Sequence, residues 1–145
     1  MRRMSMVTCL TFVAACGGAG AGQGARVVAR IHPGLSVRPL LATPREVTAG
    51  ETFTITVTTV GSDCAEADGG TVVVRDRLVR VVPYDRVRRL EGDSACPGRS
   101  PRLLSRPLQV TLTRPGPARI RVVGMSATAA EAVLDSLDAE IVVLP

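Results

Sequence analysis

The stretch Thr52-Phe-Thr-Ile-Thr-Val-Thr58 decides the fold class, because apolar and polar residues alternate along it without a break. Phe53, Ile55 and Val57 fall on one face of an extended chain, and the threonines fall on the other. Alternation with a period of two, in β-branched or aromatic residues, is typical of a strand with one buried face. The stretch therefore predicts a β-strand whose apolar face is turned toward a core.

The same kind of pattern recurs toward the C-terminal end. Two valine-rich runs, 71–75 and 78–82, are separated only by Asp76-Arg77, a spacing that suits a tight hairpin. Arg114-Pro-Gly-Pro117 is a turn signal. Further strands are expected on either side of it and at the end of the chain, over 108–112, 120–122 and 140–144.

Three segments are less decided. Residues 35–43 predict a weaker first strand at a sheet edge, because Pro39 has no amide hydrogen to donate. Residues 26–35 either extend an N-terminal tether or contribute a first edge strand. Residues 128–137 form either a short helix or a loop, since their apolar residues have helix-compatible spacing.

About seven short strands with turn signals between them favour an all-β fold, a single antiparallel β-sandwich. Pro44-Arg-Glu-Val-Thr-Ala-Gly-Glu-Thr-Phe-Thr-Ile-Thr-Val57 resembles the first kink and second strand of bacterial immunoglobulin-like domains. Residues 119–124 and the last strand resemble their closing pair, so the resemblance covers about residues 35–145 and implies an immunoglobulin-like sandwich. The chain departs from antibody domains because it has no tryptophan and no cysteine pair within its strands.

The N-terminal segment has the layout of a secretory signal. Met1-Arg2-Arg3 supplies positive charge, and the mostly apolar or small residues from Met4 to Ala15 follow. This segment is too short for a spanning helix, which needs about 20 apolar residues. Val13-Ala14-Ala15-Cys16 resembles the lipobox of bacterial lipoproteins, with Val13 in place of the commoner leucine.

The lipobox resemblance implies that residues 1–15 are a cleaved signal peptide and that Cys16 carries a thioether-linked diacylglycerol, often with N-acylation. It implies a lipid-anchored protein of the cell envelope. Gly17 is not the aspartate that typically retains lipoproteins in an inner membrane, so the outer membrane is expected where there are two. The alternative is an ordinary secretory signal cleaved nearby, with Cys16 left as a free thiol.

A glycine-rich run follows the predicted lipidation site. Residues 17–24 contain only glycine, alanine and one glutamine, a composition typical of a flexible linker. We therefore expect residues 16–25 to tether a domain of residues 26–145 to the membrane.

Composition argues against several classes of partner. All 18 basic residues are arginine, which a GC-rich genome explains without a special partner. Without Arg2 and Arg3, 16 arginines face 13 acidic residues, an excess too small to indicate nucleic-acid binding. Only Phe53 and Tyr84 are aromatic after the signal, which disfavours stacking on bases or sugars.

The four cysteines divide by position. Cys9 leaves with the signal and Cys16 takes the lipid, so Cys64 and Cys96 remain as a pair in an oxidising compartment. If the strand from Thr52 runs up, both lie at the upper pole, and closing this loop contributes about 3–4 kcal/mol in the chain-entropy model. The alternative is two reactive thiols; the spacing, with one histidine elsewhere, fits no zinc site.

Few residues are candidates for chemistry. His32 is the only histidine; we expect an exposed loop residue, since no motif supplies catalytic partners. Asp63, Glu66 and Asp68 share a loop and are weak calcium candidates, with solvated loop acids as the alternative. Asp93, Asp135 and Asp138 are expected at the same pole.

An arginine-rich region surrounds the predicted hairpin, with arginines at positions 75, 77, 80, 86, 88 and 89. Charges of this kind protect an edge strand from pairing with other chains. The functional alternative is contact with an acidic envelope polymer or lipid headgroups, weakened by salt. Tyr84 covers the core rim or makes a polar contact there.

Together these features predict a lipid-anchored envelope protein with a non-catalytic binding or structural module for adhesion or scaffolding. Binding would use the loops at one pole or a sheet edge. The alternative is an accessory subunit of a larger envelope enzyme or transport complex. We expect no catalytic residues, cofactor or nucleic-acid partner; the membrane, through Cys16, and an envelope protein or acidic polymer are the partners expected.

Overall fold

The computed structural model describes residues 24–35, 39–88, 101–129 and 132–145. These residues form strands and connecting turns, with no helix among them, which confirms the predicted all-β class. The strands are β1 (Ala25–Val28), β2 (Arg30–Ile31), β3 (Leu41–Ala42), β4 (Glu46–Thr48), β5 (Thr52–Gly61), β6 (Ala65–Arg75), β7 (Leu78–Val87), β8 (Arg102–Thr111), β9 (Gly116–Ser126) and β10 (Leu134–Leu144).

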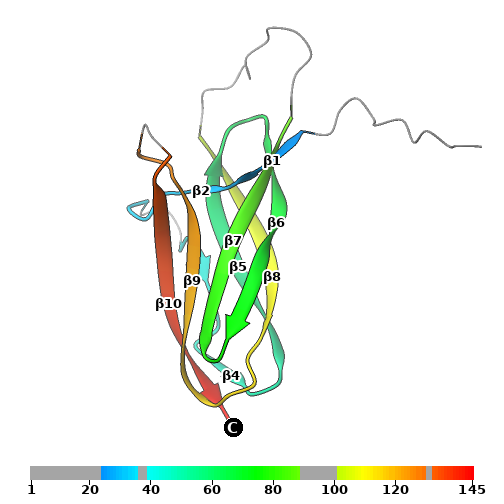
Figure 1. The fold of residues 1–145 in the computed structure, drawn as a ribbon, viewed down its shortest axis with the longest axis vertical. Helices are drawn as coiled ribbons and strands as arrows, with labels where there is room; N and C mark the ends of the chain where they lie inside the picture. The colour runs from blue at the N-terminus through cyan, green and yellow to red at the C-terminus, as the bar shows by residue number, and fades with distance from the viewer. Residues whose placement is uncertain (1–23, 36–38, 89–100, 130–131) are drawn as a thin grey trace, which may run out of the picture.

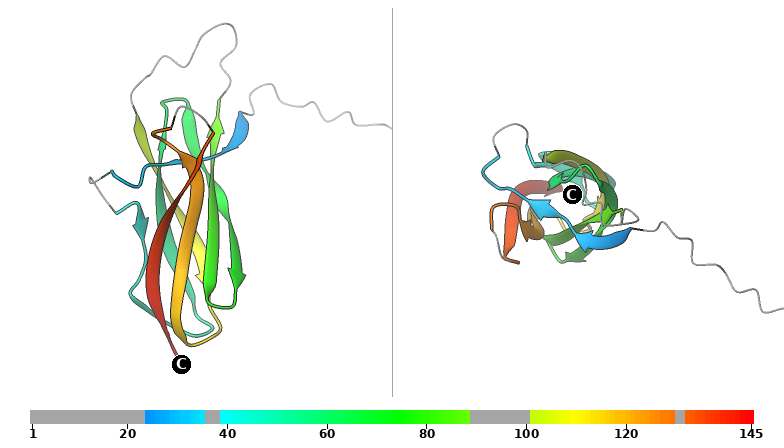
Figure 2. Two further views of the ribbon diagram at one scale, coloured as in Figure 1. Left: turned by 60° about the vertical axis from the view of Figure 1, so that its left-hand side comes forward. Right: turned by 90° about the horizontal axis from the view of Figure 1, so that it is seen from above.

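The ten strands belong to one hydrogen-bonded sheet that curls around a core (Figures 1 and 2). One side runs β6–β7–β9–β10, and the other side is β5 with β8. β2 joins the two sides, because Arg30 pairs with Val60 of β5 and with Met125 of β9. The long strands follow the long axis, so the sheet has two ends.

The sheet differs from the predicted antiparallel arrangement of about seven strands. Three of its pairings are parallel: β7 with β9, β2 with β9, and β4 with β10. β7 and β9 run in the same direction because β8, which lies between them in the sequence, crosses over to pair with β5. A parallel pair needs such a crossover connection.

β5 confirms the prediction made from its alternating sequence. Ile55 and Val57 are fully buried, while Phe53 is half-buried at the edge of the core. β5 pairs with β8 from Thr52 to Gly61. The apolar side chains of both sheet sides form the core, mainly Val79, Val81, Leu108, Val110, Leu112, Ile120, Val122, Ile141 and Val143.

The predicted hairpin is present between β6 and β7. Arg75 pairs with Leu78 across Asp76 and Arg77, and Asp76 adopts a φ of 57°. Positive φ at the first central residue is what two-residue hairpin turns require, and aspartate tolerates it better than most residues.

The three undecided segments also have definite structures. Residues 26–35 contribute most of β1 and all of β2, and the described part of residues 35–43 contributes the two residues of β3 beside β5. Leu134 and Leu137, predicted as helix or loop, belong to β10 instead. Their separation fits a helix, but β9 offers paired backbone positions along the whole of β10, from Met125 opposite Leu134.

Several predictions lie outside the described residues. These are the signal peptide of residues 1–15, Cys16 and nearly all of the tether, and Cys96, Asp93 and Arg89 of the later segment. The proposed domain boundaries therefore stay predictions. Strand β1 begins at Ala25, directly after the glycine-rich run.

Candidate functional site

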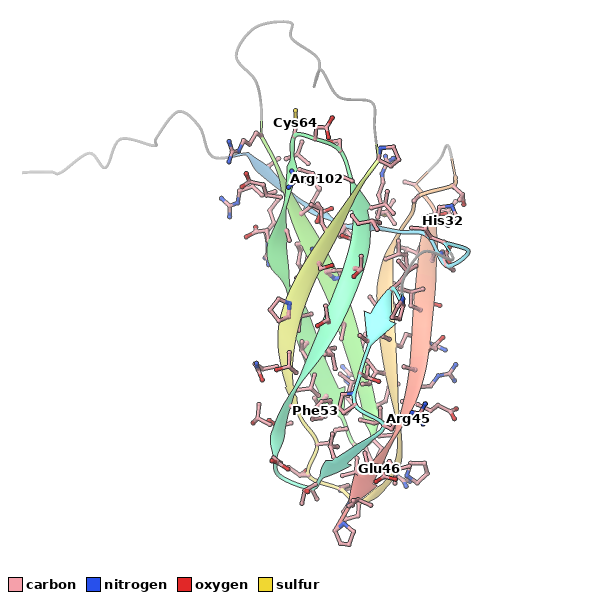
Figure 3. The ribbon with its side chains drawn as sticks, turned by 180° about the vertical axis from the view of Figure 1, so that it is seen from behind. His32, Arg45, Glu46, Phe53, Cys64 and Arg102 are labelled. Atoms are coloured by element: carbon pink, nitrogen blue, oxygen red, sulfur yellow. The ribbon has the colours of Figure 1, made fainter. Side chains whose placement is uncertain are left out.

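The first strand, β1, begins at the same end of the sheet as the turn that carries Cys64; we call this end the entry pole. Ala25 pairs with Val87 there, and the amide of Arg88 donates to the carbonyl oxygen of Cys64 at 3.0 Å. Figure 3 shows Cys64 and Arg102 at this end and Arg45 and Glu46 toward the opposite end.

Cys64 is disulfide-bonded. Its predicted partner, Cys96, lies in residues 89–100, outside the described ranges, so the pairing itself stays a prediction. The described residues on both sides of that segment lie beside the Cys64 turn, since Arg88 contacts Cys64 and Arg102 pairs with Gly61. The common pole predicted for the two cysteines stays a prediction as well.

A half-open hollow of about 940 Å³ lies at the entry pole. Its wall is mainly apolar and includes Val27, Val28, Val60, Ala65, Val87 and Met125. Ligand sites in proteins commonly measure about 300–1,000 Å³ and have mostly apolar walls with few polar groups. The hollow therefore has the size and lining of a small-molecule site.

The hollow forms at Ala29, where the N-terminal segment stops pairing with β7 and begins to pair with β9 and β5. The amide of Ala29 donates to the carbonyl of Pro83 on β7 at 2.9 Å, and its own carbonyl accepts from the amide of Met125 on β9 at 3.0 Å. β1 thus follows β7, whereas β2 lies between β9 and β5. A β-carbon on Gly124 would lie 2.7 Å from the Ala29 carbonyl oxygen, so glycine permits this close approach.

Among the described residues that line the hollow, Arg30 is the only charged one. Arg30 is exposed, and its backbone pairs with Val60 of β5 on one side and with Met125 of β9 on the other. Among the described residues, no ion pair includes its guanidinium group. The hollow therefore combines an apolar wall with one positive charge.

A buried ion pair lies farther inside the same half of the sheet. Arg106 of β8 and Asp85 of β7 have side chains that are 3% and 5% exposed, and Arg106 Nη2 lies 2.6 Å from Asp85 Oδ1. Arg106 also donates to the Thr59 hydroxyl and to the Tyr84 carbonyl. Arg106 Nε is buried without a hydrogen-bond partner among the described residues. The cluster ties β5, β7 and β8 together.

This pair was not predicted from the sequence. Arg106 continues the inward-facing series of Leu108 and Val110 on β8, and Asp85 continues that of Val79 and Val81 on β7. Extending each alternation by a few residues would have placed both charges inside. Buried charges of opposite sign are expected to pair, because an isolated buried charge is costly.

Two of the three acidic residues considered for calcium, Glu66 and Asp68, lie on β6 rather than in the predicted loop, and both pair with arginines. Asp68 Oδ2 forms an ion pair with Arg26 Nε at 3.2 Å and accepts a hydrogen bond from Arg86 Nη2 at 3.1 Å, and Glu66 pairs with Arg88. Asp63 lies exposed in the turn before Cys64. In the described ranges, no three potential ligands of a metal ion come together.

Asp138, expected at the same pole, lies instead in the middle of β10 opposite Arg121. Its Oδ1 accepts from Arg121 Nε at 2.8 Å and from Arg119 Nε at 3.0 Å. The hydrogen bond from Arg121 holds the pKa of Asp138 below its usual range. Asp135, also expected at that pole, accepts from the amide of Ser136.

The predicted arginine-rich region divides into two parts. Arg86 and Arg88 are engaged in ion pairs, whereas Arg75, Arg77 and Arg80 are exposed on the hairpin. Tyr84 lies beneath the guanidinium of Arg26, which is 4.0 Å from the centre of its ring. Tyr84 therefore makes a cation–π contact on the outer side of β7.

His32 is half-buried rather than exposed as predicted, and its Nδ1 is buried without a hydrogen-bond partner among the described residues. In the same ranges, no helix is long and apolar enough to cross a membrane. Comparisons with known protein families, with curated proteins and with solved structures found no match.

Proposed function

We propose that the chain is a lipid-anchored cell-envelope protein whose β-domain is a non-catalytic binding module. The observation that carries the proposal is the continuity between the predicted anchor and the domain. Lipobox, glycine-rich tether and first strand follow one another, and β1 begins at Ala25 without an intervening segment. A folded unit directly after a short tether is the arrangement an anchored binding domain needs.

An immunoglobulin-like relationship is part of this proposal. β5 pairs with β8, and β9 pairs with β10, as expected for the second strand and the closing pair of such a domain. The parallel pairing of β7 with β9 departs from the all-antiparallel expectation. The relationship is therefore proposed for the β5–β8 and β9–β10 pairs.

The anchor also gives the domain an orientation. The tether joins the domain at the entry pole, and its 16–25 span reaches about 15–20 Å as a flexible coil. The entry pole then faces the membrane, while the C-terminal end of β10 lies at the far end of the molecule (Figure 1). Ligands at the entry pole would come from the membrane or its surface.

Metabolic labelling with a palmitate analogue tests the anchor directly. We expect label on the wild-type chain and none on Cys16→Ser, which should be released into the soluble fraction. Cys9→Ser is the matched control, because Cys9 lies within the predicted signal, and it should keep the label. Continued labelling of Cys16→Ser would refute the proposal.

A further inference from the structure

We infer that the hollow at the entry pole binds a single-chain amphiphile, with the acyl chain against the apolar wall and an anionic head group on Arg30. This inference rests on the proposed function for one point only, the orientation of the hollow toward the membrane. Its chemistry rests on the described residues of the hollow.

The wall provides a surface for an acyl chain. Val27 of β1 lies opposite Asp85 of β7, so its side chain is on the same, inner side of the sheet. It is nevertheless 40% exposed. An apolar side chain on that face is left open to solvent because β1 and β2 follow different partners beyond Ala29. An acyl chain in the hollow would remove this apolar surface from water.

Arg30 provides the head-group contact. Among the described residues of the wall, Arg30 is the only charged one, and no ion pair in those ranges includes its guanidinium. Arginine binds carboxylate and phosphate through paired hydrogen bonds. A fatty acid and a lysophospholipid share this chemistry, and membranes supply both.

Binding is measured on the full-length chain carrying Cys16→Ser, so that acyl chains on Cys16 do not compete. The probes are palmitate, lysophosphatidylglycerol and the uncharged hexadecanol, each below its critical micelle concentration. We expect saturable binding of one anionic amphiphile per chain, and the tighter of the two anionic probes identifies the source. Absence of saturable binding by either anionic probe would overturn the inference.

Two variants with matched controls locate the site. Arg30→Met should weaken anionic binding about tenfold or more and leave hexadecanol binding unchanged, whereas Arg80→Met on β7 should change neither. Val27→Asp should abolish binding of all three probes, and Val73→Asp, at 41% exposure on β6, should not. Equal effects of a variant and its control would overturn the assignment to this hollow.

The outcome is separable from that of the anchor. Label on Cys16 without amphiphile binding would overturn this inference and leave the proposed function standing. Amphiphile binding without label on Cys16 would overturn the proposed anchor and leave this inference standing.

Discussion

The ion pair between Arg106 and Asp85 makes a sharp prediction about stability. Arg106→Met removes the guanidinium but keeps much of the apolar stem, so Asp85 is left as a buried carboxylate without its cation. The side chains are 3% and 5% exposed, so water offers almost no compensation. Loss of one partner of a buried pair costs about 3–5 kcal/mol, and we expect this loss in the free energy of unfolding.

Removal of both charges should restore most of that stability. Asp85→Leu with Arg106→Met replaces the pair with apolar side chains, and such replacements are often neutral or stabilising by about 1–4 kcal/mol. The Thr59 hydroxyl and the Tyr84 carbonyl lose a donor in both variants, which offsets part of the gain. The double variant should therefore lie near the wild type and well above Arg106→Met.

Urea unfolding followed by far-ultraviolet circular dichroism, with the disulfide intact, measures Arg106→Met, Asp85→Leu and the double variant. The denaturant slope should stay constant, so that midpoints report stability. Arg80→Met is the control, because Arg80 is exposed on β7 and should change stability by less than about 0.5 kcal/mol. A loss below about 1 kcal/mol for Arg106→Met, or a double variant as unstable as the sum of the singles, would refute the reasoning.

Two further predictions concern packing and pH. Gly124→Ala should destabilise the fold by about 1–3 kcal/mol in the same assay, since its β-carbon would lie 2.7 Å from the Ala29 carbonyl oxygen; an unchanged midpoint would contradict the close approach. Arg121 lowers the pKa of Asp138, so the charge of Asp138 stabilises the fold above about pH 4, and this stabilisation is lost as pH falls through the lowered value. Asp138→Asn should therefore be less stable than the wild type at pH 7, and the difference should shrink in acid; a constant difference across that range would contradict the pairing.

Local sequence patterns were sufficient for the strands with one buried face. β5 and the hairpin of β6 and β7 follow from alternation and from a two-residue turn, which depend on neighbours in the sequence. Leu134 was undecided because a separation of three residues from Leu137 suits a helix, and only the availability of β9 favours a strand. Parallel pairing of β7 with β9 depends on the crossover of β8, which no local pattern encodes.

The candidate site was harder still to predict from the sequence, because it is built from residues far apart in the chain. Its wall comes from β1, β2, β5, β6, β7 and β9, so none of its residues is informative alone. Arg30 looked like one of many arginines; only the structure shows that Asp68 and Asp138 pair with other arginines and that no described acid pairs with Arg30. Arg106 and Asp85 were missed because charged residues in an alternating strand are normally assigned to the exposed face.

The position of β2 between β5 and β9 has a consequence for biogenesis. During synthesis the N-terminal residues emerge first, yet Arg30 finds its partners only at Val60 and at Met125. Most of the chain, through β9, must therefore be made before β2 can complete its pairing. Such distant pairings slow folding, and the emerging apolar strands stay exposed to aggregation in the meantime. We therefore expect chains truncated before β9 to aggregate unless a chaperone is present, with β2 among the last strands to pair.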